Sequence, residues 1–159
     1  GGMLRYRDQI KISPIQFSWS IFAFLLLIQN WFGMWPRAKF INDNALFFYY
    51  SLIPMLLFYL MSVIMFPTMS PDKEINFEEH YTKNSSALFI LFGFYLVFTI
   101  ISSYVYGDIG NVFTQNIIRL IGITLCIFSA IYVHKRWIHI TFLTLNFVGL
   151  IVFMTQLPT

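Results

Sequence analysis

The apolar residues of this chain are gathered into five long runs, and charged residues are concentrated in the short segments between them. A transmembrane helix needs about 20 consecutive, mostly apolar residues to cross about 30 Å of hydrocarbon. Each run reaches that length, and little of the chain remains for a domain outside a membrane. The pattern predicts an all-α membrane protein, a single domain over 1–159 built as a bundle of five transmembrane helices at about 15–35, 45–66, 87–106, 112–133 and 137–157.

The composition supports the same class. Hydrophobic residues make up 58% of the chain and charged residues 11%, whereas a soluble domain carries roughly 25% charged residues. The net charge of +3 is scattered and forms no basic stripe, which argues against a nucleic-acid partner. Cys126 is the single cysteine, so an internal disulfide and a CxxC redox site are both excluded. No cofactor is expected.

The segments between the runs refine this picture. Pro54 lies in the middle of the second run and is expected to kink it, because its ring removes a backbone donor. In the polar stretch 68–86, Ile75, Phe77 and Tyr81 are expected to lie against the bilayer surface in an amphipathic turn or two. Only residues 134–136 join the last two runs, which predicts a tight antiparallel hairpin.

The basic residues predict an orientation, since cytoplasmic loops carry an excess of Lys and Arg. With five spans, seven basic residues fall on the side of the N-terminus and two on the other. The seven are Arg5, Arg7, Lys11, Lys73, Lys83, Lys135 and Arg136, and the two are Arg37 and Lys39. We expect a multi-pass protein of the cell (inner) membrane, with a cytoplasmic N-terminus and an external C-terminus.

Arg119 is the strongest candidate for chemistry. The apolar run after it has only 14 residues, which is too short to cross, so Arg119 is drawn into the outer part of the membrane. It serves there either as a snorkelling or interhelically bonded cation, or as the counter-ion of an anionic substrate, lipid headgroup or permeating ion. Other polar residues are expected at a similar depth and define a candidate pocket: Gln29, Asn30, Gln115, Asn116, Tyr104, Tyr106 and Asp108. Ordinary amide bonding between helices is the alternative.

Small residues recur every fourth position in the fourth run, at Gly122, Cys126 and Ala130. This spacing lets another helix approach closely, so we expect a packing seam, either within the domain or between protomers. The expected partners are the lipid bilayer and a second copy of the chain or another membrane protein.

Metal binding is a weak hypothesis. Glu79 and His80 are expected to lie on the same side as His134 and His139, and carboxylates with imidazoles suit zinc or iron. The spacing matches no standard ligand motif, and isolated interfacial histidines are usually solvated.

The order of features resembles that of a group of uncharacterised bacterial multi-span membrane proteins. The matching pieces lie within about residues 5–95: Arg5 and Arg7, Gln29-Asn30-Trp31-Phe32, Met65-Phe66-Pro67, and Phe77-Glu78-Glu79-His80-Tyr81 leading to Asn84. The chain departs from the group at Ser85-Ser86, where paired Arg is common. The resemblance implies one further helix upstream and no particular activity. Gly1-Gly2 is read either as a cloning scar or as the tail of that helix.

Three functions remain open. The first is a non-enzymatic membrane subunit or scaffold that acts through helix packing. The second is a small transporter or oligomeric channel with Arg119 in the path. The third is a lipid- or quinone-handling membrane enzyme. The sequence contains no nucleophile–base pair, P-loop or glycine-rich dinucleotide loop, which argues against an ordinary hydrolase or kinase.

Overall fold

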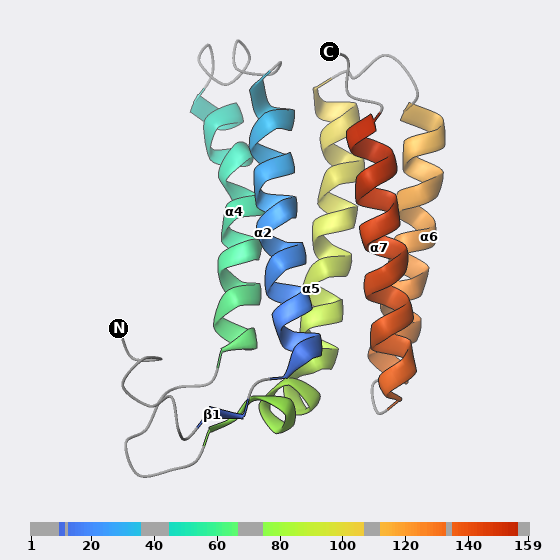
Figure 1. Ribbon diagram of the computed structural model, residues 1–159. Helices are drawn as coiled ribbons and strands as arrows, with labels where there is room; N and C mark the ends of the chain where they lie inside the picture. The colour runs from blue at the N-terminus through green and yellow to red at the C-terminus, as the bar shows by residue number, and fades with distance from the viewer. Residues whose placement is uncertain are drawn as a thin grey trace.

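A computed structural model of the chain describes residues 10–11, 13–35, 45–66, 75–106, 112–132 and 135–155. Over these residues the fold is a bundle of five helices (Figure 1), which confirms the predicted all-α bundle. The helices are α2 (Pro14–Met34), α4 (Ala45–Met65), α5 (Phe77–Val105), α6 (Val112–Ile131) and α7 (Arg136–Thr155). Two short strands, β1 (Ile10–Lys11) and β2 (Ile75–Asn76), form a parallel pair in which Ile10 faces Ile75.

The start of α2 follows from local chemistry. The Ser13 side chain caps the helix by accepting a hydrogen bond from the Gln16 backbone N–H, at 3.5 Å. Pro14 occupies the first turn, where its missing N–H costs nothing and its fixed φ suits the helix. The helix therefore begins one residue before the expected span.

The third helix is longer than the expected span. The Asn76 side chain accepts hydrogen bonds from the backbone N–H groups of Glu78 and Glu79, at 3.1 and 3.2 Å, and both carboxylates lie in the first turn, where they match the helix dipole. The 29-residue helix α5 therefore begins at Phe77. The expectation that Phe77 and Tyr81 lie on the bilayer surface is wrong, because both side chains are buried in the bundle, at 5% and 4% exposure.

Successive helices run in alternating directions (Figure 1). The β1–β2 pair lies at the end of the bundle where α2, α5 and α7 begin. Helix α5 packs along both α4 and α6, while α7 contacts α2 and α6. At the turn from α6 to α7, the Lys135 backbone N–H donates to the Tyr132 carbonyl at 3.1 Å.

An aromatic core fills the half of the bundle nearest β1 and β2. The Trp19 ring stacks on Phe142 with centroids 5.5 Å apart and makes edge contacts with Phe22, Phe89 and Phe92. These rings come from α2, α5 and α7, and each is almost fully buried. Interhelical packing therefore accounts for part of the large number of phenylalanines.

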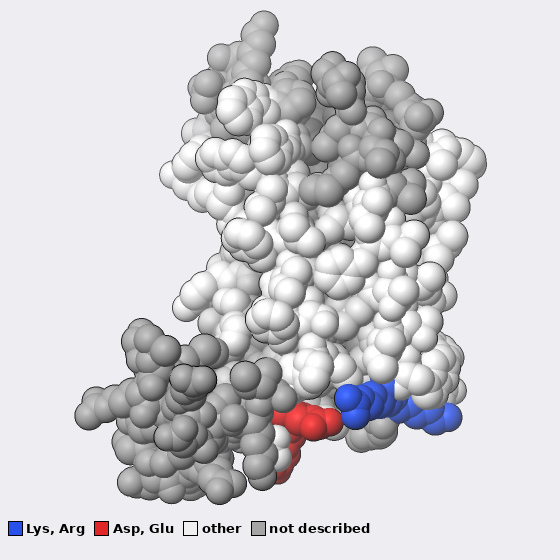
Figure 2. Space-filling model, viewed as in Figure 1, with Lys and Arg blue, Asp and Glu red and all other residues white. Residues whose placement is uncertain are grey.

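The flanks of the bundle are apolar, and the described charged residues that Figure 2 shows lie at one end. Large hydrophobic side chains are exposed along all five helices, whereas the charged residues in view in Figure 2 gather at the β1–β2 end. By length and composition α2, α4, α5 and the 113–131 part of α6 are able to cross a membrane, and the apolar helix Arg136–Ile151 in α7 is shorter. An exposed apolar belt of this extent is typical of a lipid-facing surface.

Candidate functional site

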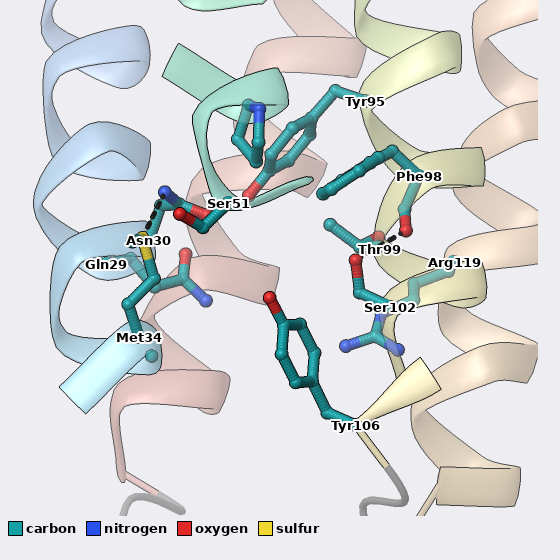
Figure 3. A pocket seen from close by; sticks show the side chains of 12 residues that line it. Gln29, Asn30, Met34, Ser51, Tyr95, Phe98, Thr99, Ser102, Tyr106 and Arg119 are labelled. Atoms are coloured by element: carbon teal, nitrogen blue, oxygen red, sulfur yellow. Dashed lines mark hydrogen bonds between the residues drawn. The ribbon is translucent and has the colours of Figure 1, made fainter. Parts of the chain in front are cut away.

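A cavity of about 110 Å³, lined by both polar and apolar residues, lies between α2, α4, α5 and α6, in the half of the bundle away from β1 and β2. Its polar lining includes Gln29, Asn30, Ser51, Thr99, Ser102 and Arg119, together with the hydroxyl-bearing rings of Tyr95 and Tyr106. In Figure 3 the guanidinium of Arg119, the hydroxyl of Tyr106 and the amide of Gln29 face the same space. Three helices and the end of α5 thus direct polar groups to one point within an apolar bundle.

Arg119 is hydrogen-bonded to a residue of its own helix. Its Nη1 donates a hydrogen bond of 2.8 Å to Oδ1 of Asn116, one turn earlier in α6. Asn116 is buried, and its amide lies 3.4 Å from Oγ of Ser103 on α5. A guanidinium carries five N–H donors in a planar fork, so this bond helps to fix its direction. Asn116 therefore positions the cation while packing α6 against α5.

The serine and threonine hydroxyls of the lining bond to backbone carbonyls. Ser51 Oγ donates to the Phe48 carbonyl at 2.6 Å, and Thr99 Oγ1 donates to the Leu96 carbonyl at 2.7 Å. Ser102 Oγ lies 2.9 Å from the Phe98 carbonyl and 3.1 Å from the Tyr50 hydroxyl. Such bonds are the usual way in which serine and threonine satisfy themselves inside membrane helices.

The two amides of α2 differ in their bonding. Asn30 Nδ2 lies 3.5 Å from Sδ of Met34, a weak bond within the helix. Gln29 Oε1 is buried and has no hydrogen-bond partner among the residues that the structure describes. A buried amide oxygen without a partner costs free energy.

The predicted pocket is assembled only in part. Gln29, Asn30 and Arg119 line the cavity, and Asn116 supports Arg119 from behind. Tyr104 does not line it and is 70% exposed on the outside of the bundle.

Gln115 is half-buried and also lies outside the cavity lining. Asp108 falls outside the described residues, whereas Tyr106 does line the cavity.

The contribution of α5 to the cavity was not predicted from the sequence. Tyr95, Thr99, Ser102 and Tyr106 all line the cavity, and their spacing of four, three and four residues places them on one helical face. This polar stripe within an apolar run was a readable signal. Ser51 and Pro54 of α4 also line the cavity, and a single serine in a long apolar run gives no such pattern.

The small-residue seam of α6 packs inside the chain, against α5. A Cβ added at Gly122 would come within 2.9 Å of Leu96 Cδ1, and one added at Gly93 would come within 3.6 Å of Cys126 Cβ. Near the other end of the seam, Ser86 Oγ donates to the Ala130 carbonyl at 3.3 Å. Of the two readings left open by the sequence, the structure places the seam within the domain.

The candidate metal ligands have other bonds. His139 is buried and its Nδ1 lies 2.7 Å from the Tyr81 hydroxyl. His80 Nε2 lies 2.9 Å from the Ile64 carbonyl, and Glu79 is exposed. His134 lies outside the described residues. Among the residues that are described, no group of three potential ligands comes together.

No known protein family, curated protein or solved structure matches this chain. The resemblance to uncharacterised bacterial multi-span proteins therefore stays a prediction. The apolar helices define the class: the chain is a multi-pass integral membrane protein with a cavity lined by four of its helices.

Proposed function

We propose that this membrane protein binds a small anionic group in the cavity beside Arg119. The observation that carries the proposal is the direction of the guanidinium, which faces a cavity whose other described lining residues are all uncharged. An anion that binds beside this guanidinium is attracted to it more strongly than in bulk water, because opposite charges interact strongly where water is scarce.

Helix packing with a partner, the function that the sequence favoured, has lost its main support. The seam at Gly122, Cys126 and Ala130 is occupied by α5 of the same chain. A homo-oligomer or a membrane-protein partner remains a prediction, and it would have to use the exposed apolar faces of the other helices. Ligand binding is therefore the better supported function.

Binding is also better supported than conduction. The rings of Trp19, Phe89 and Phe92 fill the bundle between the cavity and the β1–β2 end, and each is almost fully buried. This aromatic layer favours access to Arg119 from one side of the membrane over an open channel. The anionic group has two sources, a dissolved ion and the headgroup of a lipid, and both present the same chemistry to the guanidinium.

The proposal includes the location and orientation expected from the sequence, a bacterial inner membrane with a cytoplasmic N-terminus. Glu78, Glu79, Lys83, Lys135 and Arg136 lie in the first turns of α5 and at the start of α7, at the β1–β2 end. This is the end that the excess of basic residues assigns to the cytoplasm. The cavity then belongs to the outer leaflet.

Arg119→Gln tests the function, because it keeps a polar side chain of similar reach and removes the charge. Purified in a neutral maltoside detergent, the parent protein is expected to retain anionic lipid or bind inorganic phosphate, measured by native mass spectrometry and titration calorimetry. Arg119→Gln should lose this binding. Arg136→Gln, an exposed cation at the opposite end, is the matched control and should keep it. Equal binding by Arg119→Gln and the parent protein would remove the proposal.

A further inference from the structure

The two parts of α4 on either side of Pro54 are anchored differently. The outer segment, residues 45–53, lies in the half of the bundle away from β1 and β2, and the inner segment is residues 55–65 (Figure 1). The inner segment buries three large side chains, those of Phe58, Met61 and Met65. In the outer segment Ser51 is buried, and the other residues are exposed or half-buried. Because burial of apolar side chains is the main favourable term in packing, the inner segment is held more firmly.

Pro54 weakens the connection between the two segments. A helical carbonyl normally accepts a hydrogen bond from the N–H four residues later, and Pro54 has no N–H to donate to the Tyr50 carbonyl. The helix is nevertheless continuous from Ala45 to Met65, so it passes this point with one backbone bond fewer than its neighbouring turns. Sharp bends in long helices arise at prolines of this kind.

Side-chain contacts close the outer segment onto α5. The Tyr50 hydroxyl lies 3.1 Å from Ser102 Oγ, and its ring centroid lies 4.7 Å from that of Phe98. The rings of Phe47 and Tyr50 also lie 5.6 and 5.9 Å from that of Tyr106. A hydrogen bond between neutral groups and a few ring contacts are each weak, so they can break and re-form without unfolding the helix.

The outer segment stands between the cavity and the lipid. Ser51 and Pro54 line the cavity, whereas Tyr49, Leu52 and Ile53 are exposed on the outside of the bundle, as expected of a lipid-facing surface. Movement of this segment away from α5 would therefore uncover the cavity from the side. We propose that residues 45–53 form a gate that swings at Pro54 and opens the cavity sideways to the surrounding lipid.

Distances between pairs of spin labels test the gate in lipid nanodiscs, without any ligand. The outer pair carries labels at Tyr49→Cys on the gate and Ile118→Cys on α6, and the inner pair carries them at Tyr59→Cys and Ile127→Cys. All four positions are exposed, whereas the native Cys126 is 3% exposed and should stay unlabelled. Hinge motions take microseconds to milliseconds, and pulsed dipolar spectroscopy on frozen samples records the open and closed populations together.

The variants act on the closing contact and on the hinge separately. Tyr50→Phe removes the hydroxyl beside Ser102 and keeps the ring, so the outer distance distribution should become at least about twice as wide as the inner one, with a longer component. Adding Pro54→Ala supplies the missing N–H and should narrow it to the inner width. Tyr59→Phe, an exposed tyrosine beyond the hinge, is the matched control and should leave the outer pair unchanged. Ser102→Ala removes the same bond from the α5 side if Tyr50→Phe fails to fold.

The outcomes decide the proposal. An outer distribution as narrow as the inner one, in both the parent protein and Tyr50→Phe, would overturn the gate. A wide outer distribution that Pro54→Ala leaves unchanged would also overturn it, because the movement would then not be a hinge at Pro54. The measurement contains no anion, so failure of the anion site proposed above would leave the gate standing, and failure of the gate would leave the anion site standing.

Discussion

Asn116 Oδ1 accepts a hydrogen bond of 2.8 Å from Nη1 of Arg119, and the two residues lie one turn apart on α6. The same amide lies 3.4 Å from Ser103 Oγ on α5. Asn116 is 7% exposed. The direction of the guanidinium is therefore linked to the packing of α5 on α6 and is not set by the arginine side chain alone.

Asn116→Leu is expected to weaken ligand binding at Arg119 without removing the charge. A hydrogen bond to a charged group is worth about 1.5–3 kcal/mol, and losing it frees the long arginine side chain to turn away from the cavity. Phosphate affinity, measured by titration calorimetry, should fall about tenfold. Gln115→Leu, on the preceding residue, should bind like the parent protein. An unchanged affinity in Asn116→Leu would show that Asn116 does not position Arg119.

The number and type of helices were predictable because lipid imposes a simple rule. In hydrocarbon every backbone group must be satisfied within its own segment, so a long apolar run has few alternatives to a helix. The start of α5 was harder to predict, since polar residues around Glu78 and Glu79 resemble a loop or a surface turn. They become the first turns of a helix because Asn76 caps it and Phe77 is buried against the bundle.

Only part of the candidate site could be predicted from the sequence. Charge inside an apolar run is visible in any sequence, so Arg119 was identified directly. Depth along a helix was estimated well enough to include Gln29 and Asn30. The rotation of each helix depends on its neighbours, so Tyr104 and Gln115, at the right depth, lie outside the lining. Serine and threonine were overlooked because most of them bond only their own backbone.

Gly122→Val is expected to destabilise the bundle. A Cβ at Gly122 comes within 2.9 Å of Leu96 Cδ1, which is the flexible end of a side chain. An alanine is therefore tolerated after a small movement, whereas the two extra methyl groups of valine overpack the contact between α5 and α6 at a cost of about 1–3 kcal/mol. The measurement is the thermal unfolding midpoint in detergent.

Gly149→Val is the matched control for this prediction. A Cβ at Gly149 meets nothing within 4 Å, so its midpoint should stay close to that of the parent protein. Adding Leu96→Ala to Gly122→Val should restore part of the lost stability. Equal midpoints for the two valine variants would contradict the assignment of the seam to the contact between α5 and α6.

Tyr81→Phe is expected to lower stability through a single hydrogen bond. The Tyr81 hydroxyl lies 2.7 Å from His139 Nδ1, and both residues are buried among the aromatic rings of α2, α5 and α7. Removing one partner from a buried polar pair costs about 1–3 kcal/mol. Tyr59→Phe, on an exposed part of α4, should have no effect. Thermal unfolding compares the two variants, and equal midpoints would show that the bond contributes little.

Lys135→Cys is expected to react with a membrane-impermeant maleimide from the cytoplasmic side only. Lys135 is exposed at the turn between α6 and α7, at the β1–β2 end. The native Cys126 is 3% exposed and should stay unlabelled in the folded protein, so it needs no replacement. Labelling is compared in intact cells and in inverted membrane vesicles. Efficient labelling of Lys135→Cys in intact cells would reverse the proposed orientation.

Gly33→Leu is expected to block the cavity while leaving the fold intact. Gly33 lines the cavity, and a Cβ added there meets nothing within 4 Å, so a larger side chain has room to enter the space that the ligand would occupy. Phosphate affinity should fall at least tenfold, and the thermal midpoint should stay equal or rise, because leucine is a better helix former than glycine. Gly149→Leu shares the open surroundings but lies outside the cavity lining, so it should keep full affinity. If Gly33→Leu folded normally and bound phosphate as well as the parent protein, the ligand would have to bind elsewhere on the molecule.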